Sequence, residues 1–163
     1  MRRPIPGLSI PEPSILEPGR EYGLVLEGGG ARGAYQIGVW MALRQAGISI
    51  KAIAGASVGA LNGALICMDD VEKARTLWEN IRYSQVMNME DEVMEKLYPF
   101  RLRNLPLVLK EGLRILGSRG FDIGPLQKLI EENIDEEKIR GCGCPLYMTA
   151  CSLTDWKPLV MEV

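Results

Sequence analysis

Gly55-Ala56-Ser57-Val58-Gly59 places a serine between two glycines, where an apolar strand over residues 51–54 gives way to a helix of small residues over 60–66. This spacing suits a nucleophile elbow, because the serine then stands on a sharp, strained turn between strand and helix. A side chain at either flanking glycine, Gly55 or Gly59, would collide with neighbouring backbone. We predict that Ser57 projects its hydroxyl from the edge of a sheet, beside a helix N-terminus that favours negative charge. An inert serine in a tight turn is the alternative.

A second glycine motif, Gly28-Gly29-Gly30-Ala31-Arg32-Gly33, follows a predicted strand over residues 21–26 and precedes a predicted helix over 34–45. Its G-x-G-x-x-G spacing also occurs in dinucleotide-binding folds, which need an acidic residue at the end of the next strand. Here that strand reads Ala52-Ile53-Ala54-Gly55 and offers no acid, so a bound dinucleotide is disfavoured. The alternative is an oxyanion hole formed by backbone N–H groups of Gly28, Gly29, Gly30, Ala31, Arg32 and Gly33.

The order of elements brings the two motifs together. Residues 22–66 read as strand, helix, strand, helix, with parallel strands and with each glycine motif at the carboxyl end of its strand. Both motifs should therefore lie at one edge of the sheet. This arrangement favours acyl transfer, in which Ser57 attacks an ester carbonyl and the glycine loop holds the resulting oxyanion.

The rest of the chain is predicted to continue as one α/β domain over residues 21–163, after a proline-rich, extended arm over 1–20. Helices with charged faces are predicted over residues 70–81 and 90–97, where the residues have helical spacing. Two further helices are predicted over 105–116 and 124–134, and two strands over 145–153 and 159–163.

The composition disfavours several kinds of partner and excludes several kinds of catalytic and metal site. The 163 residues are 47% hydrophobic and 25% charged, with a net charge of −2, which fits a soluble globular protein and disfavours a nucleic-acid partner. No apolar run of about 18 residues predicts a membrane span. The chain contains no histidine, which excludes a Ser-His-Asp triad, a cysteine–histidine dyad and a histidine-ligated metal within it. We expect neither a metal nor an organic cofactor.

The four cysteines, Cys67, Cys142, Cys144 and Cys151, do not have the spacing of a zinc site. All four are interpreted as buried free thiols, since Cys67 ends an apolar helix and Cys151 lies in an apolar run. Free thiols favour a reducing, cytoplasmic compartment.

From about residue 22 to its end, the chain resembles the patatin-like phospholipases. The stretch from Leu26 to Val39 is similar to the family's glycine-rich oxyanion segment, and the stretch from Ala54 to Asn62 is similar to its nucleophile elbow. Residues 120–126 and 149–155 resemble later segments of the family. The resemblance implies a three-layer α/β sandwich around a mostly parallel sheet and a lipid acyl hydrolase, a phospholipase or esterase, that uses a Ser-Asp dyad.

The departure from the family pattern concerns the dyad's aspartate. The family places it in an Asp-Gly-Gly or Asp-Gly-Ala motif, and this chain contains no Asp-Gly pair. Asp122 and Asp155 match other segments, and Asp122 is better interpreted as a cap for the helix at 124–134. We therefore expect the base beyond Val163, an incomplete fold, and little or no hydrolysis by these residues alone. The alternative is a non-catalytic lipid-binding or interaction module with the same fold.

Peripheral contact with a membrane is suggested by basic residues among the leucines of 96–116, but helices that pack on a core with basic edges give the same pattern. Core packing is the favoured interpretation. Arg32 either orients the glycine loop or contacts an anionic head group, and an ordinary surface ion pair is an equal alternative. Trp40, Met41 and Trp78 fit core positions.

Overall fold

The computed structural model describes residues 16–87, 91–93, 104 and 122–163. The chain divides into two compact units: a sheet unit, residues 1–78 with 135–163, and a second unit, residues 79–134. Both glycine motifs lie in the sheet unit. The predicted helices over 90–97 and 105–116 fall largely outside the described residues.

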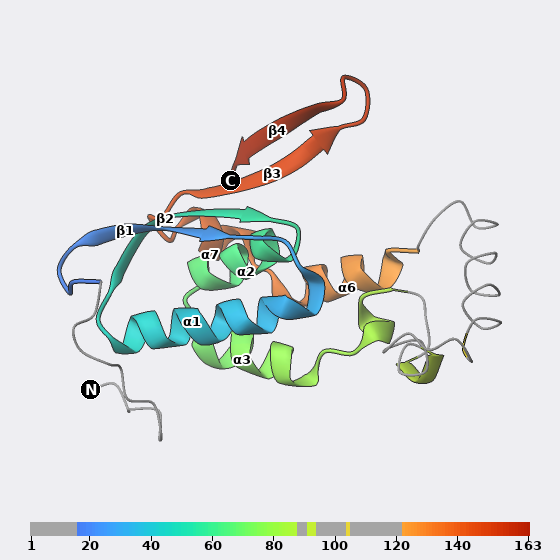
Figure 1. Ribbon diagram of the computed structural model, residues 1–163, viewed down its shortest axis with the longest axis horizontal. Helices are drawn as coiled ribbons and strands as arrows, with labels where there is room; N and C mark the ends of the chain where they lie inside the picture. Colours follow the sequence, from blue (N-terminus) through green and yellow to red (C-terminus); the bar gives the residue numbers. More distant parts are fainter. Residues whose placement is uncertain (1–15, 88–90, 94–103, 105–121) are drawn as a thin grey trace. The chain divides into compact units, whose positions relative to one another are not determined.

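The first half of the sheet unit repeats a strand followed by a helix. β1 (Glu21–Leu26) precedes α1 (Gly33–Gln45), and β2 (Ser49–Ala56) precedes α2 (Val58–Cys67), which confirms the predicted order (Figure 1). Gly47 ends α1 as predicted: its φ is 75°, and the next N–H, that of Ile48, donates to Leu43 O at 3.0 Å. These are the features of a Schellman motif, in which glycine takes the left-handed position.

The strands form one sheet in the order β1-β2-β3-β4, with β3 (Leu146–Ser152) parallel to β2 and β4 (Lys157–Glu162) antiparallel to β3. β1 and β2 are parallel, and Leu26 pairs with Gly55. The carboxyl ends of β1 and β2 are therefore level, so both glycine motifs leave the same edge of the sheet, as predicted.

The core lies where α2 packs on the sheet. Ile53 of β2 and Leu146 of β3 are paired in register and both almost fully buried. A Cβ on Gly63 of α2 would lie 2.7 Å from Leu146 Cδ1, so a larger residue there would displace this leucine from its buried position. Burying each aliphatic side chain contributes about 1.5–3 kcal/mol, which makes this contact a main source of the unit's stability.

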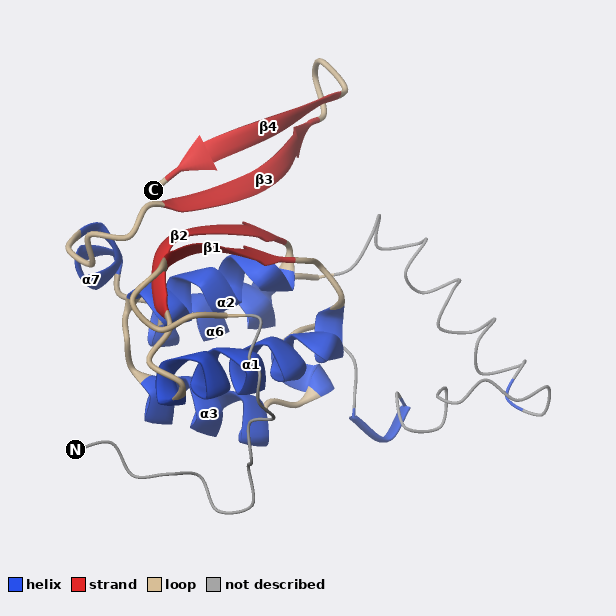
Figure 2. Ribbon diagram, turned by 60° about the vertical axis from the view of Figure 1, so that its left-hand side comes forward, coloured by secondary structure: helices blue, strands red, loops and turns tan. Residues whose placement is uncertain are grey.

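The helices α1, α2 and α3 (Val71–Asn80) lie on one side of β1 and β2 (Figures 1 and 2). On β1, Val25 remains 82% exposed. The mostly parallel sheet with flanking helices confirms the α/β fold class. The described residues show the sheet and one layer of helices.

A short helix that the sequence did not predict, α7 (Glu136–Arg140), follows Asp135. The Asp135 side chain accepts a hydrogen bond from the Lys138 N–H at 3.2 Å. Among the described residues, no helix is both long enough and apolar enough to cross a membrane.

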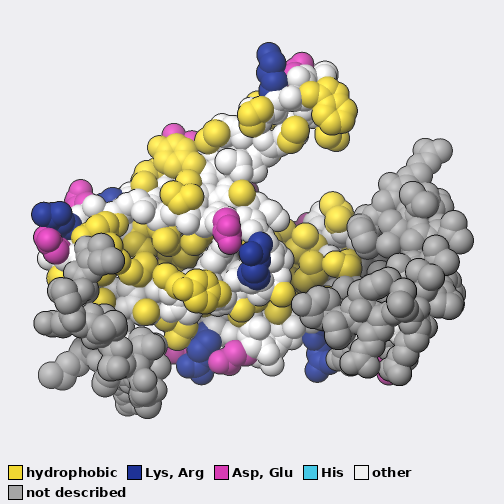
Figure 3. Space-filling view, viewed as in Figure 1, with side chains coloured by type: hydrophobic (Ala, Val, Ile, Leu, Met, Phe, Trp, Pro, Cys, Tyr) yellow, Lys and Arg dark blue, Asp and Glu magenta, His cyan; other side chains and the backbone are white. Residues whose placement is uncertain are grey.

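The β3–β4 hairpin carries exposed apolar side chains (Figure 3). Trp156 in its turn is 81% exposed, and Val160 on β4 is 68% exposed. Cys151 on β3 is also exposed, so its predicted burial was wrong, while Cys67 is buried and Cys142 and Cys144 are half-buried. An apolar run in a strand is buried only where another layer covers it, and the described residues place none there.

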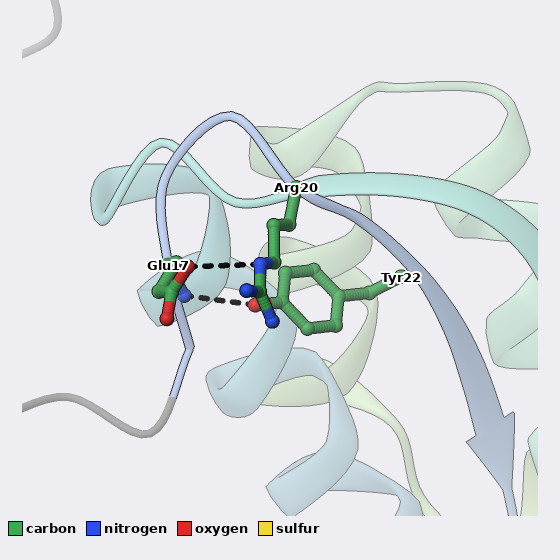
Figure 4. A network of polar contacts seen from close by, with 3 residues as sticks. All are labelled: Glu17, Arg20 and Tyr22. Atoms are coloured by element: carbon green, nitrogen blue, oxygen red, sulfur yellow. Dashed lines mark hydrogen bonds and ion pairs between the residues drawn. The ribbon is translucent and has the colours of Figure 1, made fainter.

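The segment before β1 is not extended throughout, as the sequence reading expected. Residues 17–20 form a turn in which the Arg20 N–H donates to Glu17 O at 3.3 Å, and Gly19 has a φ of 90°. Figure 4 shows the Arg20 guanidinium paired with the Glu17 carboxylate at 2.8 Å, while the Glu17 N–H donates to the Tyr22 hydroxyl at 2.8 Å. Pro18 followed by Gly19 favours this turn, because proline presets the second position and glycine permits a positive φ at the third. The other residues of the predicted arm, 1–15, lie outside the description.

The second unit contributes a 3-10 turn, η2 (Tyr83–Gln85), and α6 (Gly124–Asn133). α6 confirms the predicted helix over 124–134. Asp122 Oδ1 accepts from the Gly124 N–H at 2.9 Å, so this carboxylate satisfies a backbone donor at the helix start, one position before the N-cap residue Ile123.

Candidate active site

Ser57 lies between β2 and α2 and has φ 54° and ψ −124°. This backbone conformation is uncommon for a residue with a side chain and costs about 1–3 kcal/mol. The prediction of a strained strand-to-helix turn at Ser57 is confirmed. The Ala60 N–H donates to Ser57 O at 2.9 Å. Ser57 stands at the N-terminus of α2, and the positive end of the helix dipole favours a developing negative charge there.

The two flanking glycines are required by close backbone contacts. A Cβ on Gly55 would stand 2.6 Å from the Ala60 nitrogen, and a Cβ on Gly59 would stand 2.8 Å from the Glu27 carbonyl oxygen. Real Cβ atoms do not approach backbone this closely without displacing it. The second contact also shows that the elbow packs directly on the end of β1, where the glycine loop begins.

The glycine loop, residues 28–33, lies beside the serine. A Cβ on Gly28 would be 3.3 Å from Ser57 Cβ and 3.4 Å from Ala56 O. The loop then turns through η1 (Gly30–Arg32), with a φ of 56° at Gly30. The Arg32 N–H donates to Gly29 O at 3.2 Å, and the Gly33 N–H is bonded to the carbonyls of Gly30 and Ala31. The last two predicted oxyanion donors are thus engaged within the turn.

The Arg32 side chain folds back over its own loop. Its Nε would be 3.0 Å from a Cβ on Gly29, and its guanidinium is 3.9 Å from the Glu27 carboxylate. Both side chains of that ion pair are about three-quarters exposed, so it contributes little to stability. Arg32 therefore presents a solvent-accessible positive charge at the loop.

Asn62 is a buried polar residue that the sequence reading did not single out. Its side chain is 0% exposed, and its Nδ2 donates to Gly33 O at 2.9 Å and to Gln36 Oε1 at 2.8 Å. Its Oδ1 accepts from Trp78 Nε1 at 2.8 Å. Gln36 in turn donates from Nε2 to Glu27 O at 2.7 Å. An amide within the otherwise small and apolar helix after the serine was the available signal, because such a group is buried only with partners.

The two aspartates considered from the sequence are engaged elsewhere. Asp155 lies in the turn of the β3–β4 hairpin, where its Oδ2 accepts from the Ser152 hydroxyl at 3.3 Å. Asp122 belongs to the second unit and bonds the start of α6. Within the described ranges, no three Cys, Asp or Glu side chains are grouped so that they could hold a metal ion.

A cavity of about 360 Å³ lies at the other end of β2, around Ser49 and Trp40. Cys67, Cys142 and Cys144 contribute to its lining as free thiols. Burial raises the pKa of the Cys67 thiol far above its ordinary value, and the neighbouring Cys142 raises it further. A thiol held protonated is a poor nucleophile. The cavity is separate from the site at Ser57 because it lies around the start of β2, whereas Ser57 follows the end of that strand.

Comparison with known proteins agrees with this geometry. Residues 24–144, which include both glycine motifs, match the patatin-like phospholipase family. The chain belongs to this family. A stretch of 51 residues, 31% of the chain, is 61% identical to Lysophospholipase nte1 of Aspergillus terreus. The same length is 55% identical to Neuropathy target esterase sws of Drosophila sechellia. These matches cover only 3% and 4% of the two relatives, so the chain spans a small part of the length of the curated relatives it matches.

Proposed function

We propose that this patatin-like protein takes part in the hydrolysis of lipid acyl esters, with Ser57 as the nucleophile. The observation that carries the proposal is the strained backbone at Ser57, with φ 54°, beside the glycine loop. Strain of this kind persists where the surrounding structure enforces it and is found at active sites. The family and the names of the relatives, a lysophospholipase and an esterase, support a lipid ester as substrate.

In the proposed reaction, Ser57 Oγ attacks the ester carbonyl carbon and the carbonyl oxygen becomes an oxyanion. Backbone N–H groups of the glycine loop stabilise that oxyanion, and Gly28, Gly29, Gly30 and Ala31 are the candidate donors, since Arg32 and Gly33 donate within the turn. The bond to the leaving alcohol then breaks, which forms an acyl-serine. Water attacks the acyl-serine, releases the fatty acid and restores the serine hydroxyl.

The base that accepts the serine proton must differ from histidine, because the chain has none. We propose an aspartate, as in the dyad that the family resemblance implies, and its position beyond Val163 stays a prediction. General-base assistance contributes about 10²–10⁴-fold to such reactions. The 163 residues alone should therefore hydrolyse esters very slowly.

The test uses a single-chain lysophospholipid substrate and a fluorophosphonate probe, which reacts with activated serines. The wild type, Ser57→Ala and Ser49→Ala are compared, both in the 163-residue chain and in any longer product of the same gene. Ser49 is the matched control, because it lies at the opposite end of the same strand. Labelling and hydrolysis should disappear with Ser57→Ala and persist with Ser49→Ala.

Two outcomes would redirect the proposal. Full activity of the 163 residues would place the base within them and make Asp155 or Asp122 the first candidate for substitution. Lipid binding without turnover by the longest product would instead favour the non-catalytic lipid-binding module.

A further inference from the structure

The two ends of the glycine loop are bonded to two side-chain amides. The carbonyl of Glu27, just before the loop, accepts from Gln36 Nε2 at 2.7 Å. The carbonyl of Gly33, the last residue of the loop, accepts from Asn62 Nδ2 at 2.9 Å. The second Asn62 N–H donates to Gln36 Oε1 at 2.8 Å, so the two amides form one continuous set of hydrogen bonds.

The loop needs such external support because of its composition. Three consecutive glycines have no side chains with which to pack, and glycine has the greatest backbone freedom of any residue. An oxyanion hole works only if its donors already point at the position of the oxyanion, and misplacement by about 1 Å can lower a rate 10²-fold. Stability of the fold alone does not ensure that alignment.

Asn62 is placed to couple the loop to the nucleophile. It lies on α2, the helix that begins directly after Ser57, and Gly59 of the same helix packs on the Leu26 and Glu27 backbone. The third bond of the Asn62 amide, from Trp78 Nε1 to Oδ1 at 2.8 Å, sets the orientation of the amide, because only a nitrogen can donate and only an oxygen can accept there. Both Asn62 N–H groups are consequently directed at Gly33 and Gln36.

We propose that Asn62 is a positioning residue for the oxyanion loop and that it acts partly through Gln36. In this role the two amides hold the carbonyls at both ends of the loop and keep its N–H groups aligned with the Ser57 hydroxyl. The inference rests on the proposed function of Ser57. A purely structural role for Asn62 is the competing explanation, and it predicts loss of folded protein without loss of rate per folded molecule.

The experiment measures kcat and KM for a lysophospholipid with the most active form of the protein, in Asn62→Asp, Gln36→Met and Asn133→Asp. Asn62→Asp keeps the shape of the side chain and its acceptor for Trp78 but removes both N–H donors. We expect kcat to fall about 10- to 10²-fold while KM changes less than about twofold, because the loop acts on the transition state. Asn133→Asp, the matched change in the second unit, should leave both constants unchanged, since Asn133 bonds Leu129 O of its own helix, α6.

A second readout separates alignment from folding. A trifluoromethyl ketone that mimics the acyl chain forms an oxyanion adduct with the serine, whereas the corresponding ether does not. Affinity for the ketone should fall in parallel with kcat in Asn62→Asp, and affinity for the ether should stay within about twofold. Thermal unfolding of each variant establishes the folded fraction to which the rates are normalised.

Gln36→Met keeps the proposal testable if Asn62→Asp does not fold, because Gln36 is only half-buried. This variant removes the bond to Glu27 O, and about a tenfold loss of kcat is expected. Unchanged kcat and ketone affinity in a folded Asn62→Asp or Gln36→Met would overturn the positioning role. Activity that survives Ser57→Ala would instead overturn the proposed nucleophile, so the two failures are distinguishable.

Discussion

The elbow at Ser57 and the β3–β4 hairpin belong to one sheet but are held in different ways. At the elbow, backbone packs on backbone, and both flanking glycines are enclosed by main-chain atoms. In the hairpin, the strands pair from Tyr147 with Glu162 to Ser152 with Lys157, while the side chains of β4 remain exposed. The elbow should therefore tolerate almost no added atom, whereas the hairpin should tolerate most changes that preserve its backbone hydrogen bonds.

The largest effect is expected from Gly59→Ala. The new methyl group would overlap the backbone of Leu26 and Glu27, and we expect a loss of about 3 kcal/mol or more in the free energy of unfolding. Gly38→Ala is the control, because apart from its own helix backbone nothing lies within 4 Å of a Cβ at that position. It should be stabilising by about 0.5–1 kcal/mol. Urea unfolding measures both, and a stable Gly59→Ala protein would contradict the close packing of the elbow.

Thiol reactivity gives the second contrast, between Cys67 on the elbow helix and Cys151 in the hairpin. Burial raises the pKa of Cys67, so at pH 8 less of its reactive thiolate is present, and Cys151 is exposed. We expect Ellman's reagent to modify Cys151 at least about tenfold faster than Cys67. Single Cys→Ala variants of the four free cysteines assign the phases of the reaction. Equal rates in the folded protein would show that α2 is not buried as described.

A smaller effect is expected from the backbone strain at Ser57. Ser57→Gly relieves the strain and Ser57→Ala retains it, so the glycine variant should be more stable by about 1 kcal/mol, although both should lack hydrolysis. Trp156→Gly provides the hairpin counterpart, because Trp156 has a φ of 51°. It should change stability in the same direction and leave hydrolysis unaffected. A glycine variant less stable than Ser57→Ala would mean that the elbow is unstrained.

The smallest effect is expected from Val160→Thr on β4. The side chain is 68% exposed, so the free energy of unfolding should change by no more than about 0.5 kcal/mol. Denaturant unfolding monitored by circular dichroism measures the change. A loss of about 2 kcal/mol would show that Val160 is packed against another surface in solution.

The nucleophile turn could be predicted from the sequence because two glycines flank the serine at a fixed spacing, between an apolar strand and a helix. Gly55 and Gly59 flank Ser57 at positions where only glycine fits, and Gly47 ends α1 at a left-handed position. The parallel pairing of β1 and β2 also followed, since two neighbouring strands joined by a crossover helix run in the same direction. These features follow from motif spacing and element order, even though some of the residues that they bring together, such as Leu26 and Gly59, lie far apart in the chain.

The remaining features were decided by contacts between distant residues. Asn62 bonds Gly33, 29 positions away, and Trp78, 16 positions away, and no periodicity in the sequence encodes such a network. The exposure of Cys151 depends on which layers cover β3, and the same apolar run would be buried beneath a helix. Sequence alone determined the strained serine and the glycine loop, because a turn and a loop with these backbone demands accept only glycine at fixed positions in the motif. Only the tertiary structure decided what holds that loop in place, because a buried amide takes its partners from whichever elements pack around it.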